Sequence, residues 1–234
     1  MSRRYDAVFL DAQGTLLKPH PSTGGIYSSA CRGVGHDRPE EEVSRAIREL
    51  WIELRPIPAG PEGRYDTSDE DTRLWWQGFN TRLFHKLELR EGEREFVQAL
   101  WEDFARPENW RLFPEVDEVL GELRARGYLM GVVSNWDSRL LSICESLGIT
   151  RQMEFILASA PAGVEKPDPR IFRMALSLAG VAPERAIHVG DDYEADVLGA
   201  RGAGIRALWL ARDGETAEGE APLRSLAELL DLLP

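Results

Sequence analysis

The sequence predicts an α/β protein with a doubly wound, mostly parallel sheet and a helical segment inserted near its N-terminal end. In the C-terminal half, short apolar runs alternate with helical stretches, which is typical of right-handed strand-helix-strand crossovers with helices on both sheet faces. A long, strand-poor stretch separates the first apolar run from the second. The length of 234 residues exceeds the roughly 100–200 residues of one domain and therefore fits a full domain with an insertion.

Five apolar runs are the predicted strands, and they occupy residues 7–10, 128–133, 154–159, 186–190 and 205–210. Apolar residues at helical spacing lie between the later runs. One such stripe consists of Leu140, Leu141, Cys144 and Leu147, and another of Ile171, Ala175 and Leu178. We expect these stripes to face the sheet.

The inserted stretch, from about residue 23 to 105, is predicted to be helical because its apolar residues recur every three or four positions. The stripes are Val43, Ile47, Leu50 and Leu54; then Trp76, Phe79, Leu83 and Leu87; and finally Phe96, Leu100 and Phe104. The pairs Thr67-x-x-Glu70 and Ser68-x-x-Asp71 predict a capped helix start. The proline and glycine content of residues 55–63 predicts a loop.

Composition and charge exclude several classes of protein. Hydrophobic residues make up 43% and charged residues 29%, as in ordinary globular proteins. No apolar run approaches the ~18 residues of a membrane span, and Asp6 and Asp11 interrupt the N-terminal stretch, unlike a signal peptide. We therefore expect a soluble, cytoplasmic protein. The net charge of −12 disfavours nucleic acid and acidic membranes as partners, and Cys31 and Cys144 lack the spacing of a zinc site or disulfide framework.

Polar side chains follow the apolar runs at the points where the predicted strands end. Asp11 follows the first run, Ser134-Asn135 the second and Asp191-Asp192 the fourth, and Lys166 lies in the loop beyond the third. Singly, each fits a turn, a helix cap or a surface lysine. Together they predict one site, because open α/β sheets bind ligands beyond the carboxyl ends of their strands.

The segments "DAQGT", "VVSNWD", "VEKPDPRIF" and "GDDYEADVLGARGAG", in that order, resemble the four motifs of the haloacid dehalogenase-like hydrolase superfamily. The closing "IRALWL…LRSLAELLDLL" is similar to the last strand and helix of that fold. The resemblance implies a Rossmann-like core at 1–17 and 108–234 and an α-helical cap at 18–107, with hinges near 17–19 and 106–107. "TSDEDTRLWW" resembles the cap of a branch that lacks the second aspartate of the first motif.

The resemblance also implies roles for the aspartates of the first and fourth motifs. Asp11 would be the nucleophile and would form an aspartyl-phosphate. Mg²⁺ would be bound by Asp11, the backbone carbonyl of Gln13 and Asp191, since this hard cation prefers oxygen ligands. Either Asp192 or Asp196 would hold the waters of the metal or support its other ligands.

Other matched positions would bind the phosphoryl group. Ser134 and the backbone amide of Asn135 would donate hydrogen bonds to its oxygens, and Lys166 would neutralise its developing charge. Gly14 and Thr15 would let the chain turn tightly after the nucleophile. The implied partner is a small phosphorylated substrate, and the oligomeric state stays open.

Gln13 departs from the usual pattern of the family, in which a second aspartate protonates the leaving group. Glutamine cannot transfer a proton near neutral pH, and the loss of a general acid typically lowers the rate about 10²–10⁴-fold. Three hypotheses follow: a phosphohydrolase that is slow or restricted to acyl and aryl phosphates, a hydrolase resembling the family's 2-haloacid dehalogenases, or a catalytically quiet ligand- or protein-binding member. Candidates for a replacement proton donor are Glu70, Asp71 and His85.

Overall fold

The computed structural model describes residues 4–54, 65–217 and 219–233, and its central feature is a five-stranded parallel sheet. The strand order is β5-β4-β1-β6-β7. The strands are β1 (Ala7–Leu10), β4 (Leu129–Ser134), β5 (Phe155–Ala158), β6 (Ala186–Gly190) and β7 (Arg206–Trp209). These match the five predicted strands closely, and the doubly wound α/β fold is confirmed.

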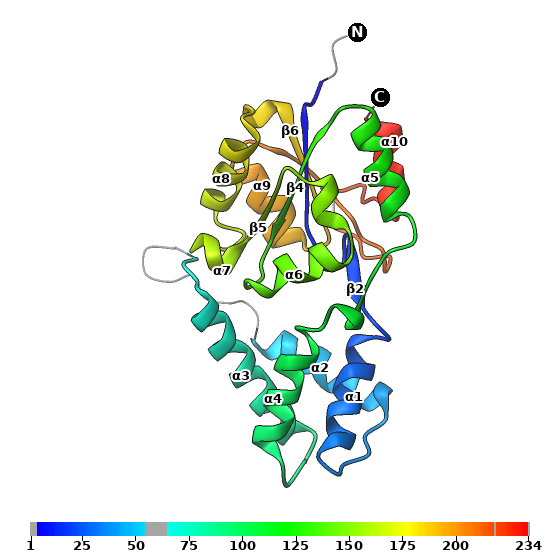
Figure 1. Cartoon of the computed structure of the whole chain (residues 1–234), viewed down its shortest axis with the longest axis vertical. Coiled ribbons are helices and arrows are strands. Elements are labelled where there is room, and N and C mark those ends of the chain that lie inside the picture. Colours follow the sequence, from blue (N-terminus) through cyan, green and yellow to red (C-terminus); the bar gives the residue numbers. More distant parts are fainter. Residues whose placement is uncertain (1–3, 55–64, 218, 234) are drawn as a thin grey trace.

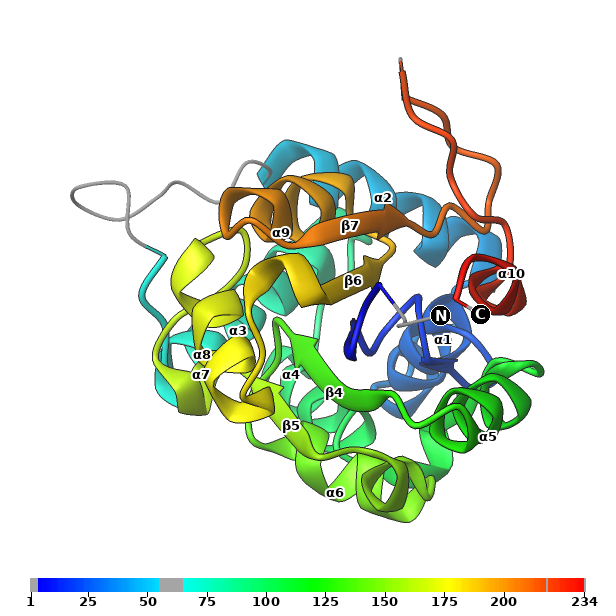
Figure 2. The ribbon, with the colours of Figure 1, turned by 90° about the horizontal axis from the view of Figure 1, so that it is seen from above.

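Helices cover both faces of this sheet (Figure 2). In β1, Ala7 and Phe9 pack into a hydrophobic cluster on the face covered by α8 (Pro169–Ala179) and α9 (Gly199–Gly202). Val8 and Leu10 pack into the opposite cluster, which includes residues of α5 (Val116–Ala125), α6 (Arg139–Ser146) and α10 (Leu229–Leu232). Because both faces are covered, the strand reads as a continuous apolar run rather than an alternating one.

Shorter elements complete the core. They are α7 (Ser159–Ala162), the π-helix η5 (Tyr193–Leu198), and the 3₁₀ turns η2 (Pro107–Asn109), η3 (Ile149–Gln152), η4 (Pro183–Arg185) and η6 (Leu226–Glu228).

Two residues of the predicted helical stripes face solvent instead of the sheet. In α6, Leu140 and Cys144 are buried but Leu141 is 48% exposed, because it follows Leu140 by about 100° around the helix. In α8, Leu178 is 57% exposed. The buried stripe of that helix consists of Ile171, Phe172, Ala175 and Leu176. The predicted stripe was therefore right at Ile171 and Ala175 and wrong at Leu178.

The insertion forms a separate helical cap below the sheet (Figure 1). Its helices are α1 (Thr23–Gly33), α2 (Glu40–Leu54), α3 (Asp69–Lys86) and α4 (Glu93–Asp103), and they enclose a hydrophobic cluster of their own. The predicted cap of α3 is confirmed at Ser68, whose hydroxyl accepts from the Asp71 amide. The loop predicted at 55–63 lies outside the described residues.

A two-stranded antiparallel ribbon connects the cap to the sheet, and the sequence did not predict it. It consists of β2 (Leu17–Pro19) and β3 (Trp110–Leu112), with Leu17 paired to Leu112. Both strands are only three residues long, too short for an alternating pattern to be read. The ribbon lies near both predicted domain boundaries, whose positions stay a prediction.

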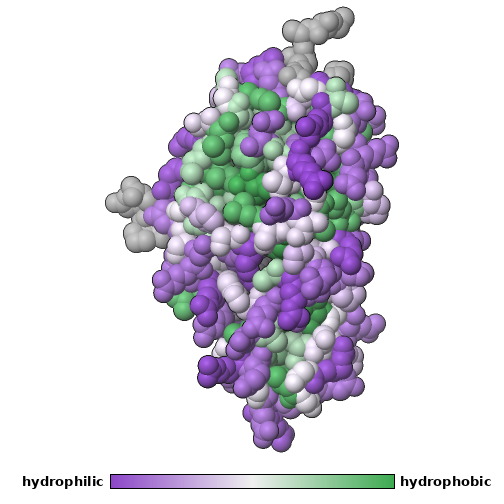
Figure 3. All heavy atoms as spheres, viewed as in Figure 1, coloured by the Kyte–Doolittle hydropathy of each residue, from purple (hydrophilic) through white to green (hydrophobic). Residues whose placement is uncertain are grey.

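The surface shown in Figure 3 is uneven in polarity. Apolar side chains gather over the sheet part of the molecule, whereas most of the cap on this face is hydrophilic. The edge strand β5 consists of Phe155, Ile156 and Leu157, all half-buried, and the buried Ala158. Within the ranges described above, no helix combines the length and apolar character that crossing a membrane requires.

Candidate active site

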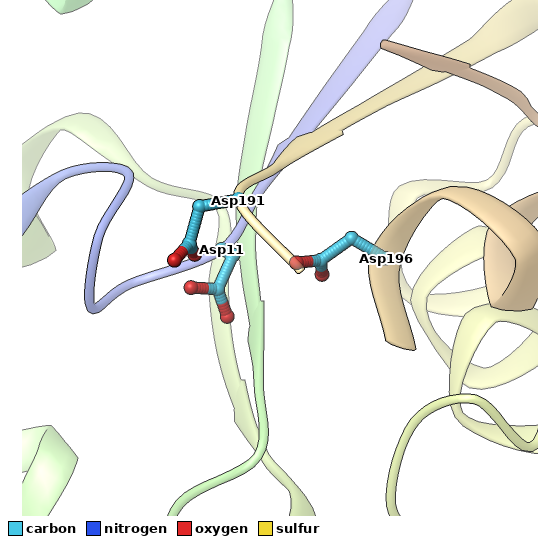
Figure 4. Close-up of side chains that lie close together, drawn as sticks. All are labelled: Asp11, Asp191 and Asp196. Carbon is cyan, nitrogen blue, oxygen red and sulfur yellow. The ribbon is translucent and has the colours of Figure 1, made fainter. Parts of the chain in front are cut away.

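The sheet topology brings the polar residues of three adjacent strands together. Asp11 directly follows β1, Ser134 ends β4 and Asp191 directly follows β6, and β1 lies between the other two strands. Because all three strands are parallel, these residues meet at one edge of the sheet. Figure 4 shows that Asp196, from η5, points toward Asp11 and Asp191 at this edge.

Lys166 links two of these carboxylates from a buried position. Its Nζ lies 2.6 Å from Asp11 Oδ1 and 2.5 Å from Asp196 Oδ1. All three residues are buried. A buried ammonium group that pairs with two carboxylates is held in place by charge-assisted hydrogen bonds, which are shorter and stronger than neutral ones.

Three carboxylates form an acidic cluster whose oxygens can bind a cation. One oxygen each of Asp11, Asp191 and Asp196 lies within 4.8 Å of the others. Oxygen-only ligands suit hard cations such as Mg²⁺, and Lys166 supplies only one compensating positive charge within this group. The donor set therefore fits a divalent cation.

The pKa values in the cluster reflect burial and mutual repulsion. Burial raises the pKa of Asp11, although Lys166 opposes this effect. Loss of hydration, followed by the charges of Asp11 and Asp196, raises the pKa of Asp191 to about 8. Burial also favours protonation of Asp196, but Lys166 and His188 outweigh it and lower the pKa of that carboxyl. Burial disfavours the charged form of Lys166, yet the charges of Asp11 and Asp196 raise its pKa above the ordinary value.

Asp196 is held by two further contacts. His188 Nε2 lies 2.8 Å from Asp196 Oδ1, and the Asp192 amide donates to Asp196 Oδ2 at 3.0 Å. Asp192 has a different place: its Oδ1 accepts from the amides of Glu194 and Ala195 and caps η5. Of the two residues considered for the metal environment, the structure brings Asp196 into the acidic cluster and uses the Asp192 carboxylate as a helix cap.

The turn after Asp11 is shaped by Gly14. Its φ is +84°, and a Cβ added there would lie 2.2 Å from Asp191 Oδ2. Glycine is therefore needed both for the left-handed backbone and for the close approach of Asp191. Gln13 is exposed and forms an isolated bridge with Leu17. Thr15 is fully buried, and its hydroxyl has no hydrogen-bond partner among the described residues.

Ser134 and Asn135 take different positions relative to Asp11 and Lys166. Ser134 is buried, and a hydrogen bond from its side chain favours the ionised form of Asp11, which counters the rise in the pKa of that carboxyl. The Asn135 side chain forms two hydrogen bonds with the main chain of Lys166. Its Nδ2 donates to the Lys166 carbonyl at 2.8 Å, and its Oδ1 accepts from the Lys166 amide at 2.7 Å. The predicted contact of the Asn135 backbone amide with phosphate stays a prediction.

Arg212 is a site residue that the sequence reasoning missed. Its guanidinium donates to the carbonyls of Gly14 at 3.0 Å and Thr15 at 2.9 Å, and to Glu115 Oε1 at 2.6 Å. It also lies 3.7 Å from the centroid of the Phe113 ring. Arg212 follows the last strand and belongs to no recognisable pattern, so only the fold reveals that it fixes the turn after Asp11.

The candidates for a replacement proton donor lie in the cap helix α3. Glu70 and Asp71 are exposed in its first turn. His85 lies in its last turn, where Nε2 is 3.2 Å from Glu93 Oε2. An 18-residue helix is about 27 Å long, so His85 and the first-turn acids cannot serve the same site.

Comparison with known proteins points to one family. A family model described as haloacid dehalogenase-like hydrolase matches residues 5–204. "Haloacid dehalogenase-like hydrolase domain-containing protein 3" of Danio rerio is 33% identical over 97% of this chain and 94% of its own. A phosphoserine phosphatase of Thermus thermophilus is 39% identical over 92% of each chain. The crystal structure of a putative beta-phosphoglucomutase from Thermotoga maritima, 20% identical, covers 97% of both chains with a TM-score of 0.75.

Proposed function

Since this chain belongs to the haloacid dehalogenase-like hydrolases, we propose that it is a Mg²⁺-dependent phosphohydrolase acting on a small phosphorylated metabolite. Asp11 would be the nucleophile and would form an aspartyl-phosphate. The observation that carries the proposal is the convergence of Asp11, Lys166, Asp191 and Asp196 at one edge of the sheet. The similarity to a phosphoserine phosphatase over most of the chain supports it.

The first chemical step is attack by the Asp11 carboxylate on phosphorus, with cleavage of the bond between phosphorus and the leaving oxygen. Lys166 holds Oδ1 of Asp11 at 2.6 Å, which orients the other carboxylate oxygen for attack. The Lys166 ammonium and the Ser134 hydroxyl would stabilise charge on the phosphoryl oxygens. Water then hydrolyses the acyl phosphate and restores Asp11.

Mg²⁺ would be held by the acidic cluster, with Asp11 and Asp191 as ligands and Asp196 supporting it. Carboxylates crowded within 4.8 Å of one another favour a cation at this place. When bound, the ion would supply charge neutralisation for the phosphoryl group. The backbone carbonyl of Gln13 is the remaining proposed ligand from the protein.

Gln13 would restrict the range of substrates. Its amide can orient water or a phosphoryl oxygen but cannot protonate an alkoxide leaving group. Acyl and aryl phosphates have leaving groups that depart without a proton, so they would turn over faster than alkyl phosphates. The acidic cluster counts against the 2-haloacid dehalogenase alternative, because three carboxylates would repel the carboxylate of such a substrate.

The test measures Mg²⁺-dependent phosphate release from acetyl phosphate, p-nitrophenyl phosphate and phosphoserine. We expect the wild-type protein to hydrolyse the first two substrates and to act slowly on phosphoserine, an alkyl ester. Gln13→Asp is expected to raise the rate on phosphoserine by about 10²–10⁴-fold, the usual contribution of a general acid. Asp11→Asn is expected to be inactive on all three.

Two results would contradict the proposal. Equal activity of Asp11→Asn and wild type would exclude Asp11 as the nucleophile. No phosphate release by either wild type or Gln13→Asp would remove the phosphohydrolase proposal and favour a ligand-binding member of the family. If wild type and Gln13→Asp released phosphate from phosphoserine at equal rates, only the role proposed for Gln13 would be rejected, and the phosphohydrolase proposal would stand.

A further inference from the structure

Residues 65–69, which lead into α3 of the cap and are here called the strap, lie against the loop that precedes Lys166. Asp66 forms an antiparallel bridge with Val164. The Glu165 amide donates to the Tyr65 carbonyl at 2.9 Å, and the Thr67 amide donates to the Gly163 carbonyl at 3.4 Å. The cap therefore adds a short strand-like segment to the core immediately before Lys166.

A side-chain contact reinforces this pairing. Arg170 donates to Asp66 Oδ1 at 2.7 Å and, from the same nitrogen, to Asp168 Oδ2 at 2.8 Å. Asp168 is buried and caps α8 by accepting from the Arg170 amide. Asp66 of the strap is thus tied to the residues that fix the chain just after Lys166, as well as to those just before it.

The strap also holds the loop that follows β4. The Ser138 amide donates to Asp69 Oδ1 at 2.8 Å. This loop begins with Asn135, directly after Ser134, and the Asn135 side chain binds both the amide and the carbonyl of Lys166. The two core loops are therefore joined to each other through Asn135 and are both joined to the cap through the strap.

Resting on the proposed function, we infer that Asp66 and Asp69 are positioning residues for phosphoryl transfer. They hold the loop that carries Lys166 and the loop that directly follows Ser134 in the arrangement that receives the phosphoryl group. Neither residue needs to contact the substrate, because Asp66 acts through the Arg170 side chain and Asp69 acts through the Ser138 amide. The consequence is that the phosphate-binding groups are fully assembled only while the strap lies on the core.

The contacts of the strap are suited to being made and broken. The side chains of Asp66 and Arg170 are 61% and 40% exposed, and exposed ion pairs contribute little to overall stability. Release of the strap would leave the hydrophobic clusters of cap and core intact. A segment with these properties can open for substrate and product and close for the chemical step.

The first test follows backbone hydrogen exchange in the Asp66→Ala/Asp69→Ala double variant. Amides of residues 163–166, of Asp168 and of Ser138 are expected to exchange about 10-fold faster than in wild type, while amides of β1 and β6 are unchanged, because the strap holds only the loops and not the strands. Asp6→Ala is the matched control. It removes a carboxylate that pairs with Arg185 at 2.7 Å before β1, and it is expected to leave exchange at 163–168 unchanged.

The second test measures kcat and KM for acetyl phosphate with Mg²⁺. The double alanine variant is expected to lose about 10–100-fold in kcat, the scale of a small misplacement of reacting groups. Asp66→Asn/Asp69→Asn keeps an oxygen acceptor at both positions and is expected to recover most of this loss. If the loss in kcat came only from removal of the negative charges, it would be equal in the alanine and asparagine variants.

The outcomes separate this inference from the proposed function. Unchanged exchange at 163–168 in the double alanine variant would overturn the inference whether or not the protein is a phosphatase. Unchanged kcat in an active enzyme would overturn the positioning role while leaving the phosphatase proposal standing. Faster local exchange together with a kcat loss that asparagine restores would establish the positioning role of Asp66 and Asp69 as a pair.

Discussion

At the scale of single residues, Gly14 connects the turn after Asp11 to the acidic cluster. We expect Gly14→Ala to lower phosphate release by more than 100-fold, because its Cβ would lie 2.2 Å from Asp191 Oδ2 and displace that carboxylate. The left-handed backbone at φ +84° would add a loss of about 1–2 kcal/mol in unfolding free energy. Urea unfolding and a phosphate-release assay measure the two effects.

Gly78→Ala is the matched control for this prediction. Gly78 lies inside α3 with nothing within 4 Å of an added Cβ and no positive φ. The same substitution there should stabilise the protein by up to about 1 kcal/mol and leave activity unchanged. Equal activities of Gly14→Ala and Gly78→Ala would mean that the turn does not place Asp191.

Much of the site follows from the sequence because its residues come directly after apolar strands. Asp11, Ser134 and Asp191 were predicted to meet, and the structure places them at one sheet edge. Spacing could not decide between Asp192 and Asp196, because the π-helix that turns Asp196 inward has no sequence signature. Arg212 was missed because its function consists of bonds to main-chain carbonyls distant in sequence, which no local pattern records.

At the scale of elements, Arg212 links the segment after β7 to the turn that precedes β2, through hydrogen bonds to the carbonyls of Gly14 and Thr15. Arg212→Met keeps a side chain against the Phe113 ring but leaves the carbonyls of Gly14 and Thr15 and the carboxylate of Glu115 without this donor. We expect a loss of about 1–3 kcal/mol in unfolding free energy, the usual effect of leaving buried acceptors unpaired. Denaturant titration measures it, and kcat should fall with it.

Arg206→Met provides the comparison for that variant. Arg206 begins β7, donates to the Tyr5 hydroxyl at 3.0 Å and lies 5.8 Å from the centroid of its ring. It belongs to the same strand region but to the opposite end of the sheet. A kcat equally reduced in both variants would show that Arg212 acts through general stability and not through the turn after Asp11.

The elements differ in how well the sequence predicts them. The five apolar runs predicted the sheet because a strand covered on both faces must be apolar throughout. The ribbon was missed because only Leu17 and Trp110 of its residues are buried. Within the strap, Thr67 and Ser68 were predicted to begin a helix, but the pairing of the strap with residues 163–165 depends on contact between cap and core, which no local sequence pattern records.

At the scale of the whole molecule, the acidic cluster should make stability depend on pH and Mg²⁺ together. Loss of hydration and neighbouring carboxylates raise the pKa of Asp191 to about 8 in the folded protein, above its unfolded value of 3.8. A raised folded pKa contributes stability at low pH that is lost as pH rises through that value. The metal-free protein should therefore lose stability as pH rises from about 4, near the unfolded pKa, to about 8.5, just above the folded pKa.

Mg²⁺ should reverse this loss, because it replaces the proton on Asp191 as the neutralising charge. The increase in Tm on adding Mg²⁺ is expected to be larger at about pH 8.5 than at about pH 5.5, as measured by thermal unfolding. The lowered pKa of Asp196 and the raised pKa of Lys166 keep both groups charged across this interval. Asp191→Asn should remove most of the pH-dependent gain, and an equal Mg²⁺ effect at both pH values would argue against the cluster as the metal site.

The β2–β3 ribbon makes the cap an insertion that begins and ends at adjacent positions. Because Leu17 pairs with Leu112, the chain leaves the sheet and returns to it at neighbouring positions. For the core, the whole cap is therefore equivalent to one long loop between Leu17 and Leu112. The entropic cost of closing a loop grows only slowly with its length. A change in the length of the cap away from residues 65–69 should therefore cost the sheet little stability, whereas replacement of the whole cap would also remove the contacts that residues 65–69 make with the core loops.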